Sequence, residues 1–178
     1  MANVIRDPLL AIARLLILIA QGLMVIAAIA LAVGLPLVLF LRDEITARIQ
    51  VQYGDPAMFF PLTDVTGLMI LGLAIVALAF LFLRKLRQIV DTVALGDPFV
   101  PDNAARLTAM AWLMLGIEAL TIPAALLGFN IARVLEETGA EADMSLDFSG
   151  IILVVVLFIL ARVFRKGAEM RTDLEGTV

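Results

Sequence analysis

Residues 15–41 read LLILIAQGLMVIAAIALAVGLPLVLFL and contain no charged side chain. A helix that crosses about 30 Å of hydrocarbon at about 1.5 Å per residue needs about 20 apolar residues. The stretch is longer than the h-region of a signal peptide, which runs to about 7–15 residues. Its apolar residues are continuous, whereas the wall of a membrane β-barrel alternates. The stretch therefore predicts a permanent transmembrane helix.

Three further apolar blocks follow the first one. The chain is 62% hydrophobic and 17% charged, whereas soluble domains average roughly 45–50% apolar and about 25% charged. We expect an all-α membrane protein, a single domain over residues 1–178, whose short loops make an up-down-up-down bundle of four transmembrane helices. The last span is short, but the arginines that follow it can extend it by keeping their charges at the headgroups. The predicted spans are 15–41, 65–83, 107–129 and 145–161.

The positive charges indicate how the chain is oriented. Ten Lys and Arg residues lie before the first span, between the second and third spans, or after the fourth. Only three lie in the other two loops. Since positively charged segments stay in the cytoplasm, we expect both termini there. The loop between the third and fourth spans is acidic and outside, either a solvated connector or a surface that attracts cations or a partner.

The connection between the second and third spans contains strong helix-ending signals. We expect the second helix to continue past the lipid as an amphipathic extension and to end at Gly96, a residue that tolerates the left-handed conformation. Pro98 and Pro101 are expected to prevent its continuation. Asp102 or Asn103 is then expected to cap the next helix. The fourth helix is expected to continue into the cytoplasm as the tail.

One acidic residue, Glu118, lies deep in the third apolar block. It is about 16 Å from the block's start at about 1.5 Å per residue, near the bilayer midplane. An ionised carboxylate there costs a few kcal/mol, so the side chain is expected to face other helices. Its expected partners are Gln21, Thr66, Thr121 or the Ala119 carbonyl, which a proline four residues later leaves without a donor. The residue either ties helices together or forms a proton, cation or ligand site.

The sequence lacks the residues that several classes of enzymes and metal-binding proteins use. The chain has no cysteine and no histidine, which removes the commonest metal ligand and general base. It also has no phosphate-binding glycine loop and no paired nucleophile and base. We therefore expect no enzyme activity, no metal and no cofactor. The expected cytoplasmic face carries ten cations beside seven acids, which favours membrane lipids over direct nucleic-acid binding.

Two stretches, 96–107 and 163–178, together form a recognisable pattern. The pattern is a Gly-x-Pro-Phe turn, an Asn-x-x-Arg-Leu helix start and an Asp-x-Glu-x-Thr-hydrophobic ending. Over essentially its whole length the chain resembles an uncharacterised family of four-helix bacterial membrane proteins, catalogued as domain of unknown function 2975. The matching positions are Gly96, Pro98, Phe99, Asn103, Arg106, Leu107, Asp173, Glu175, Thr177 and Val178.

The resemblance implies a location and a kind of partner rather than an activity. It implies the bacterial inner membrane, and family members are described as neighbours of small helix-turn-helix regulators. The matching residues are then candidates for a cytoplasmic docking surface. They also have a structural interpretation, in which Phe99 covers helix ends and the tail folds back so that Thr177 or Val178 meets Arg106.

Two functional hypotheses follow from the sequence. The first is a non-enzymatic inner-membrane protein that binds a cytoplasmic partner, such as a helix-turn-helix regulator, through residues 96–107 and the tail. The second is a small transporter or a lipid- or ligand-binding protein that uses Glu118 and Gln21 inside the bundle. In the second case a homo-oligomer is expected, because four helices make a thin pore wall.

Overall fold

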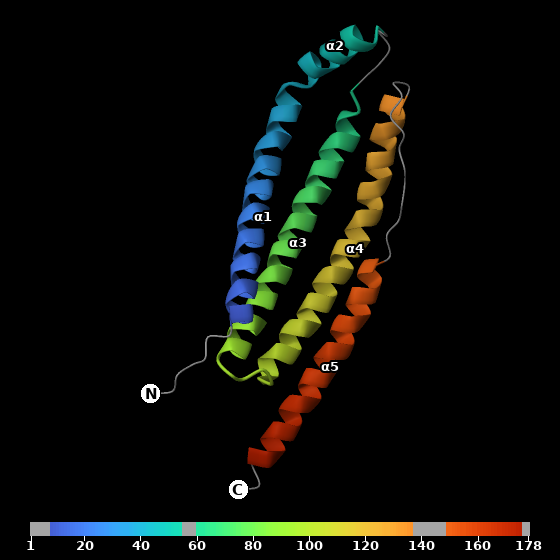
Figure 1. Cartoon of the computed structure of the whole chain (residues 1–178). Coiled ribbons are helices and arrows are strands. Elements are labelled where there is room, and N and C mark those ends of the chain that lie inside the picture. Colours follow the sequence, from blue (N-terminus) through green and yellow to red (C-terminus); the bar gives the residue numbers. More distant parts are fainter. Residues whose placement is uncertain (1–7, 55–59, 137–148, 176–178) are drawn as a thin grey trace. The chain divides into compact units, whose positions relative to one another are not determined.

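The computed structural model describes residues 8–54, 60–136 and 149–175, and every regular element in these ranges is an α-helix. The prediction of an all-helical chain is thereby confirmed. The described elements, in chain order, are α1 (Pro8–Phe40), α2 (Arg42–Tyr53), α3 (Leu62–Ala94), α4 (Pro101–Glu136) and α5 (Ser149–Glu175) (Figure 1).

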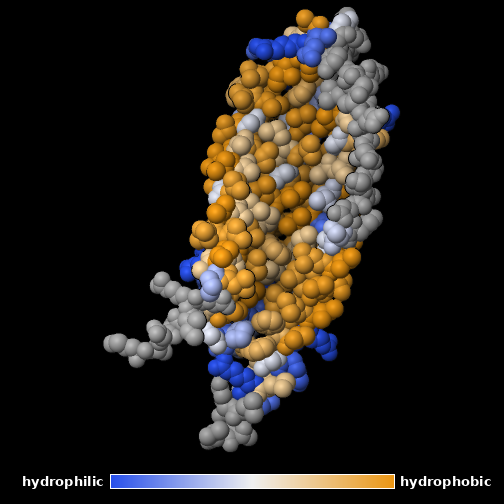
Figure 2. All heavy atoms as spheres, in the orientation of Figure 1, coloured by the Kyte–Doolittle hydropathy of each residue, from blue (hydrophilic) through white to orange (hydrophobic). Residues whose placement is uncertain are grey.

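Three of these helices, α1, α3 and α4, are long and apolar enough to cross a membrane. Thirty-three residues of α1 extend over about 50 Å at about 1.5 Å per residue. Large apolar side chains are exposed along it, including Leu23, Ile26 and Val33 at 62%, 64% and 61%. Apolar side chains cover the long helices in Figure 2. Such continuous apolar surface suits lipid rather than water, so the helices point to a membrane location.

The helix α5 is not one of these three, because its apolar part is short. Within the described residues only 149–161 precede the first of its cations, Arg162. Thirteen residues reach about 20 Å at about 1.5 Å each, less than the hydrocarbon thickness. The predicted fourth span also includes residues 145–148, which lie outside the described residues.

The helix α2 was not predicted. The chain breaks at Leu41 and resumes as α2, with Asp43 and Glu44 in the first turn, where carboxylates are favourable next to the free N–H groups. Its end is closed by Gly54 in the left-handed conformation, φ 71°. These acids and this glycine are the sequence signals that mark α2.

The connection between α3 and α4 confirms one prediction and corrects another. As predicted, α3 stops just before Gly96, whose φ of 84° is left-handed. The expectation that Asp102 or Asn103 caps the next helix is wrong, because α4 already begins at Pro101. Proline suits the first helical position, since the N–H that it lacks would have no partner in the helix there. The Asn103 backbone N–H donates to Val100 O (2.9 Å).

The described residues group into two compact units, and parts of α1, α3 and α4 belong to each. The first unit draws on 1–25, 78–118 and 148–178. In it, α5 lies alongside the N-terminal half of α4 (Figure 1). The core of this unit consists of Ile89, Leu107, Met110, Ala111, Leu157 and Ala161.

The second unit draws on 26–77 and 119–147. At two glycines of this unit, the side chain of a neighbouring helix reaches the glycine's Cα. A Cβ at Gly34 would lie 3.0 Å from the Cε of Met69, and one at Gly67 would lie 2.9 Å from the Cδ1 of Leu127. Close approach at small residues is how helices associate in lipid.

Candidate functional site

The two stretches that carry the sequence pattern contact each other in the first unit. An Arg171 guanidinium N–H donates to the carboxylate of Asp97. The ring of Phe99 lies against Gly167, where a Cβ would be 2.6 Å from the ring's Cδ1. Phe99 also packs against Phe164, with ring centroids 5.4 Å apart. We call residues 95–107 and 163–175 together the junction.

A buried amide holds the turn of the junction together. Asn103 is 0% exposed, and its Nδ2 donates to Pro98 O (2.9 Å) and to Thr92 Oγ1 (2.8 Å). The Thr92 hydroxyl in turn donates to Ile89 O (2.8 Å). Buried polar groups require such partners. Asn103 therefore fixes the end of α3 to the start of α4, and its side chain is not available to a partner in this conformation.

Arg106 has the same kind of local role. Its guanidinium donates to Asn103 Oδ1 (2.8 Å) and to Gln88 O (3.4 Å), and it lies 3.6 Å from the Asp102 carboxylate. The side chain is only 21% exposed. The predicted contact of Arg106 with Thr177 or Val178 involves residues outside the described ranges. The side chain of Glu175 is also outside them, and Asp173 is exposed on α5.

Several apolar side chains of the junction remain exposed beside charged ones. Leu95, Phe99 and Met170 are 81%, 41% and 57% exposed. Exposed apolar groups bordered by polar residues are typical of protein interaction sites. Beside these contacts, a small cleft of about 140 Å³ lies between the turn and α5, and it is lined by Asp97, Phe99, Val100, Pro101, Ala168, Arg171 and Thr172.

Two of the predicted intramembrane polar residues have hydrogen-bond partners other than Glu118. Gln21 is 7% exposed, and its Oε1 accepts a hydrogen bond from Arg87 Nη1 (3.4 Å). The Thr66 hydroxyl donates to the carbonyl of Leu62 in its own helix (2.8 Å). Thr121 is exposed on α4. Arg87 was not among the residues predicted to contact Gln21.

Glu118 is half-buried in α4 and its carboxyl lies against Gly150 of α5. A Cβ at Gly150 would overlap the Glu118 carboxyl and would lie 2.9 Å from the Cε of Met114. The missing side chain at residue 150 thus makes room for the acid. Glycines inside apparent helices signal such close approaches, and both Gly150 and Gly167 were overlooked in the sequence.

The described residues contain no group of three or more Asp and Glu side chains that could hold a metal ion. A family model described as "Protein of unknown function (DUF2975)" matches residues 42–178. The match begins at the first residue of α2 and includes the whole junction. No curated protein and no solved structure matches the chain.

Proposed function

The chain belongs to the family described as "Protein of unknown function (DUF2975)", and on that premise we propose that it is a non-enzymatic membrane protein whose junction docks a cytoplasmic protein. The resemblance drawn from residues 96–107 and 163–178 is confirmed by the family match. The family description names no activity, so the proposal rests on the geometry of the junction.

The proposed setting is a bacterial inner membrane crossed four times, by α1, α3, α4 and α5, with both termini in the cytoplasm. The length and composition of α1, α3 and α4 support three of the spans. For α5, Arg162 and Arg165 extend the apolar part by keeping their guanidinium groups at the headgroups. The distribution of Lys and Arg supports this orientation, which puts the junction on the cytoplasmic side.

The observation that carries the docking proposal is the contact between the two family stretches. They are far apart in the chain, yet Asp97 with Arg171 and Phe99 with Gly167 hold them in one place. The resulting surface offers exposed apolar side chains, among them Met170, beside charges of both signs. A surface of this composition suits a protein partner. The partner that we propose is a small helix-turn-helix regulator, as the resemblance implies.

Site-specific photocrosslinking tests this proposal. A photoreactive phenylalanine derivative is introduced at Met170 or at Thr172, both exposed on α5. The control places it at Gln52, exposed on α2. In intact cells we expect a single adduct with a soluble DNA-binding protein at the two junction positions and none at Gln52. The same adducts at all three positions, or adducts with lipid only, would contradict docking at the junction.

A second candidate function uses Glu118. The observation that favours this function is that the Glu118 carboxyl lies at the contact between α4 and α5, next to Gly150. In this alternative the chain is a small transporter or a ligand-binding protein, assembled as a homo-oligomer. Substituting Glu118→Gln separates the two functions. If the chain is a docking protein, the Glu118→Gln variant should still crosslink at Met170. If it is a transporter or a ligand-binding protein, this variant should lose its response to the ion or ligand.

A further inference from the structure

A groove runs between the start of α4 and the middle of α5, away from the cleft at the junction. Its volume is about 630 Å³, within the range of about 300–1,000 Å³ that is usual for ligand sites. Its α5 residues recur at helical spacing and share one face of the helix. The lining consists of Thr108, Phe158, Ala161, Arg162, Arg165, Lys166 and Glu169.

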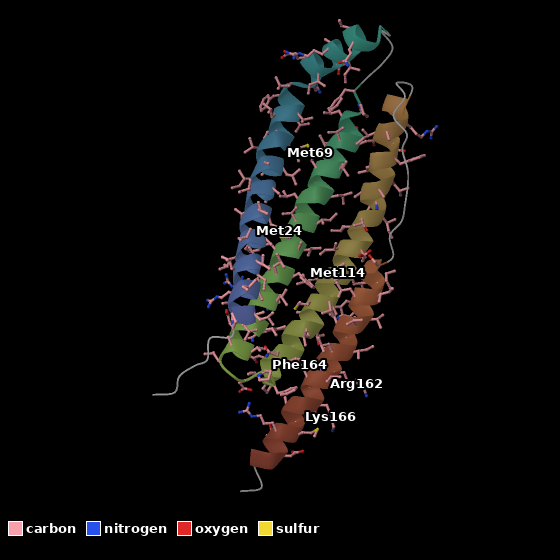
Figure 3. The ribbon with its side chains drawn as sticks, in the orientation of Figure 1. Met24, Met69, Met114, Arg162, Phe164 and Lys166 are labelled. Carbon is pink, nitrogen blue, oxygen red and sulfur yellow. The ribbon has the colours of Figure 1, made fainter. Side chains whose placement is uncertain are left out.

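The groove is apolar at one end and cationic at the other. Phe158 and Ala161 belong to the apolar part of α5, and the three cations follow within the next two turns. Arg162 and Lys166 lie one turn apart along α5 (Figure 3). Trp112 of α4 meets Phe158 edge to face, with centroids 5.6 Å apart, and is 61% exposed. Tryptophan next to cations is typical of the boundary between hydrocarbon and headgroups.

The cations of the groove are available for an anion. Within the part of the chain that the structure describes, Arg162 and Arg165 have no ion-pair partner. Lys166 lies 3.5 Å from the carboxylate of Glu169, but both side chains are exposed, so this pair is weak. Three cations and one acid leave the groove net positive. Two neighbouring guanidinium groups match the oxygens of a phosphate.

We propose that this groove binds an anionic phospholipid. Its phosphate lies among Arg162, Arg165 and Lys166, and an acyl chain lies along Phe158 and Trp112. A lipid fits both ends of the groove, whereas a free phosphate or a phosphorylated peptide would leave the apolar end without a matching group. The groove shares Arg165, Lys166 and Glu169 with the junction, but lipid binding is a function distinct from docking, and it requires that α5 lies at the membrane.

The first test compares lipids and charge variants. The full-length chain is purified in mild detergent and titrated with phosphatidylglycerol, with phosphatidylcholine and with inorganic phosphate, and the thermal midpoint is followed. We expect about tenfold tighter binding of phosphatidylglycerol than of phosphatidylcholine, and no effect of inorganic phosphate. The double variant Arg162→Gln/Arg165→Gln should lose this preference. A control that removes two exposed arginines elsewhere, Arg84→Gln/Arg133→Gln, should keep it.

The single tryptophan of the chain provides a second measurement that needs no variant. Trp112 fluorescence is recorded in phosphatidylcholine vesicles that contain a small fraction of lipid with brominated acyl chains. Brominated phosphatidylglycerol should quench Trp112 several-fold more than brominated phosphatidylcholine at the same fraction. Equal quenching by the two lipids would overturn the proposal, as would retained lipid preference in the Arg162→Gln/Arg165→Gln variant. The proposal would also be overturned if inorganic phosphate, without any lipid, stabilised the protein, because the cations would then bind a free anion.

Discussion

The ring of Phe99 packs on Gly167, joining the turn between α3 and α4 to the polar half of α5. No other amino acid at residue 167 would leave the ring in its place, because a Cβ there would lie 2.6 Å from Cδ1 and 2.8 Å from Cε1 of Phe99. The contact joins two stretches that lie about seventy positions apart in the sequence. It makes the junction a single surface.

The substitution Gly167→Ala is expected to destabilise the protein. The added methyl group must displace the Phe99 ring, and overpacking of this kind costs about 1–3 kcal/mol. The free energy of unfolding, measured by denaturing-detergent titration, should fall by that amount. Gly22→Ala is the matched control, because a Cβ at this helical position meets nothing within 4 Å. If the two variants are equally stable, Phe99 does not pack on Gly167.

Removing the buried amide of Asn103 is expected to loosen the junction. Asn103→Ala leaves the Pro98 carbonyl and the Arg106 guanidinium without one partner each, and an unmade buried hydrogen bond costs about 1–3 kcal/mol. Asn130→Ala, at an exposed position of the same helix, should change the free energy of unfolding by less than about 0.5 kcal/mol. The same titration measures both variants. If Asn130→Ala lowers the free energy of unfolding as much as Asn103→Ala does, the result would argue against the hydrogen-bond network of Asn103.

Glu118 and Gly150 are expected to be energetically coupled. Gly150→Ala alone places a methyl group where the Glu118 carboxyl lies, so the carboxyl must move and the variant should be less stable. Glu118→Ala makes space for that methyl group. The double variant should therefore be more stable than the sum of the single changes predicts, by about 0.5–3 kcal/mol. Additive effects in this double-mutant cycle would mean that the carboxyl does not occupy the space next to Gly150.

Removing the ion pair of Asp97 and Arg171 is expected to weaken binding of the partner without lowering the stability of the protein. The two side chains are 39% and 49% exposed, and pairs at such positions contribute at most about 1 kcal/mol. Arg171→Ala should thus leave the unfolding midpoint nearly unchanged but reduce photocrosslinking of the partner at Met170. Lys85→Ala, on α3 outside the junction, serves as the comparison. Undiminished crosslinking in Arg171→Ala would remove Arg171 from the docking surface.

Much of the fold could be predicted from local sequence, because long apolar runs and helix-ending glycines act locally. Residues 15–41 predicted α1 to within one residue of its end, and Gly96 predicted the end of α3. Pro101 was expected to end a helix, but it starts α4. A proline after a helix is compatible with both roles, because it cannot continue the preceding helix and also suits the first turn of the next one. The helix α2 is polar and lacks an apolar face, so hydrophobic periodicity gave no signal for it.

The candidate site was harder to predict, because its contacts join distant parts of the chain. The family pattern identified Asn103 and Phe99 but not their roles, which depend on Thr92 and Gly167. Gln21 was expected near Glu118, and Arg87 was not considered as its partner, because an arginine at the lipid boundary was assigned to headgroups. One-dimensional spacing places residues along a helix, but it does not say which neighbouring helix they face.

Docking at the junction requires that α5 crosses the membrane and places residues 163–175 on the cytoplasmic side. The chain has no cysteine, so Thr172→Cys and Gln52→Cys each provide a single labelling site on a fully native background. A membrane-impermeant maleimide is applied to bacterial cells with a permeable outer layer, before and after the inner membrane is opened. We predict that Gln52→Cys is labelled at once and Thr172→Cys only after opening. Labelling of Thr172→Cys with the inner membrane intact would contradict the account.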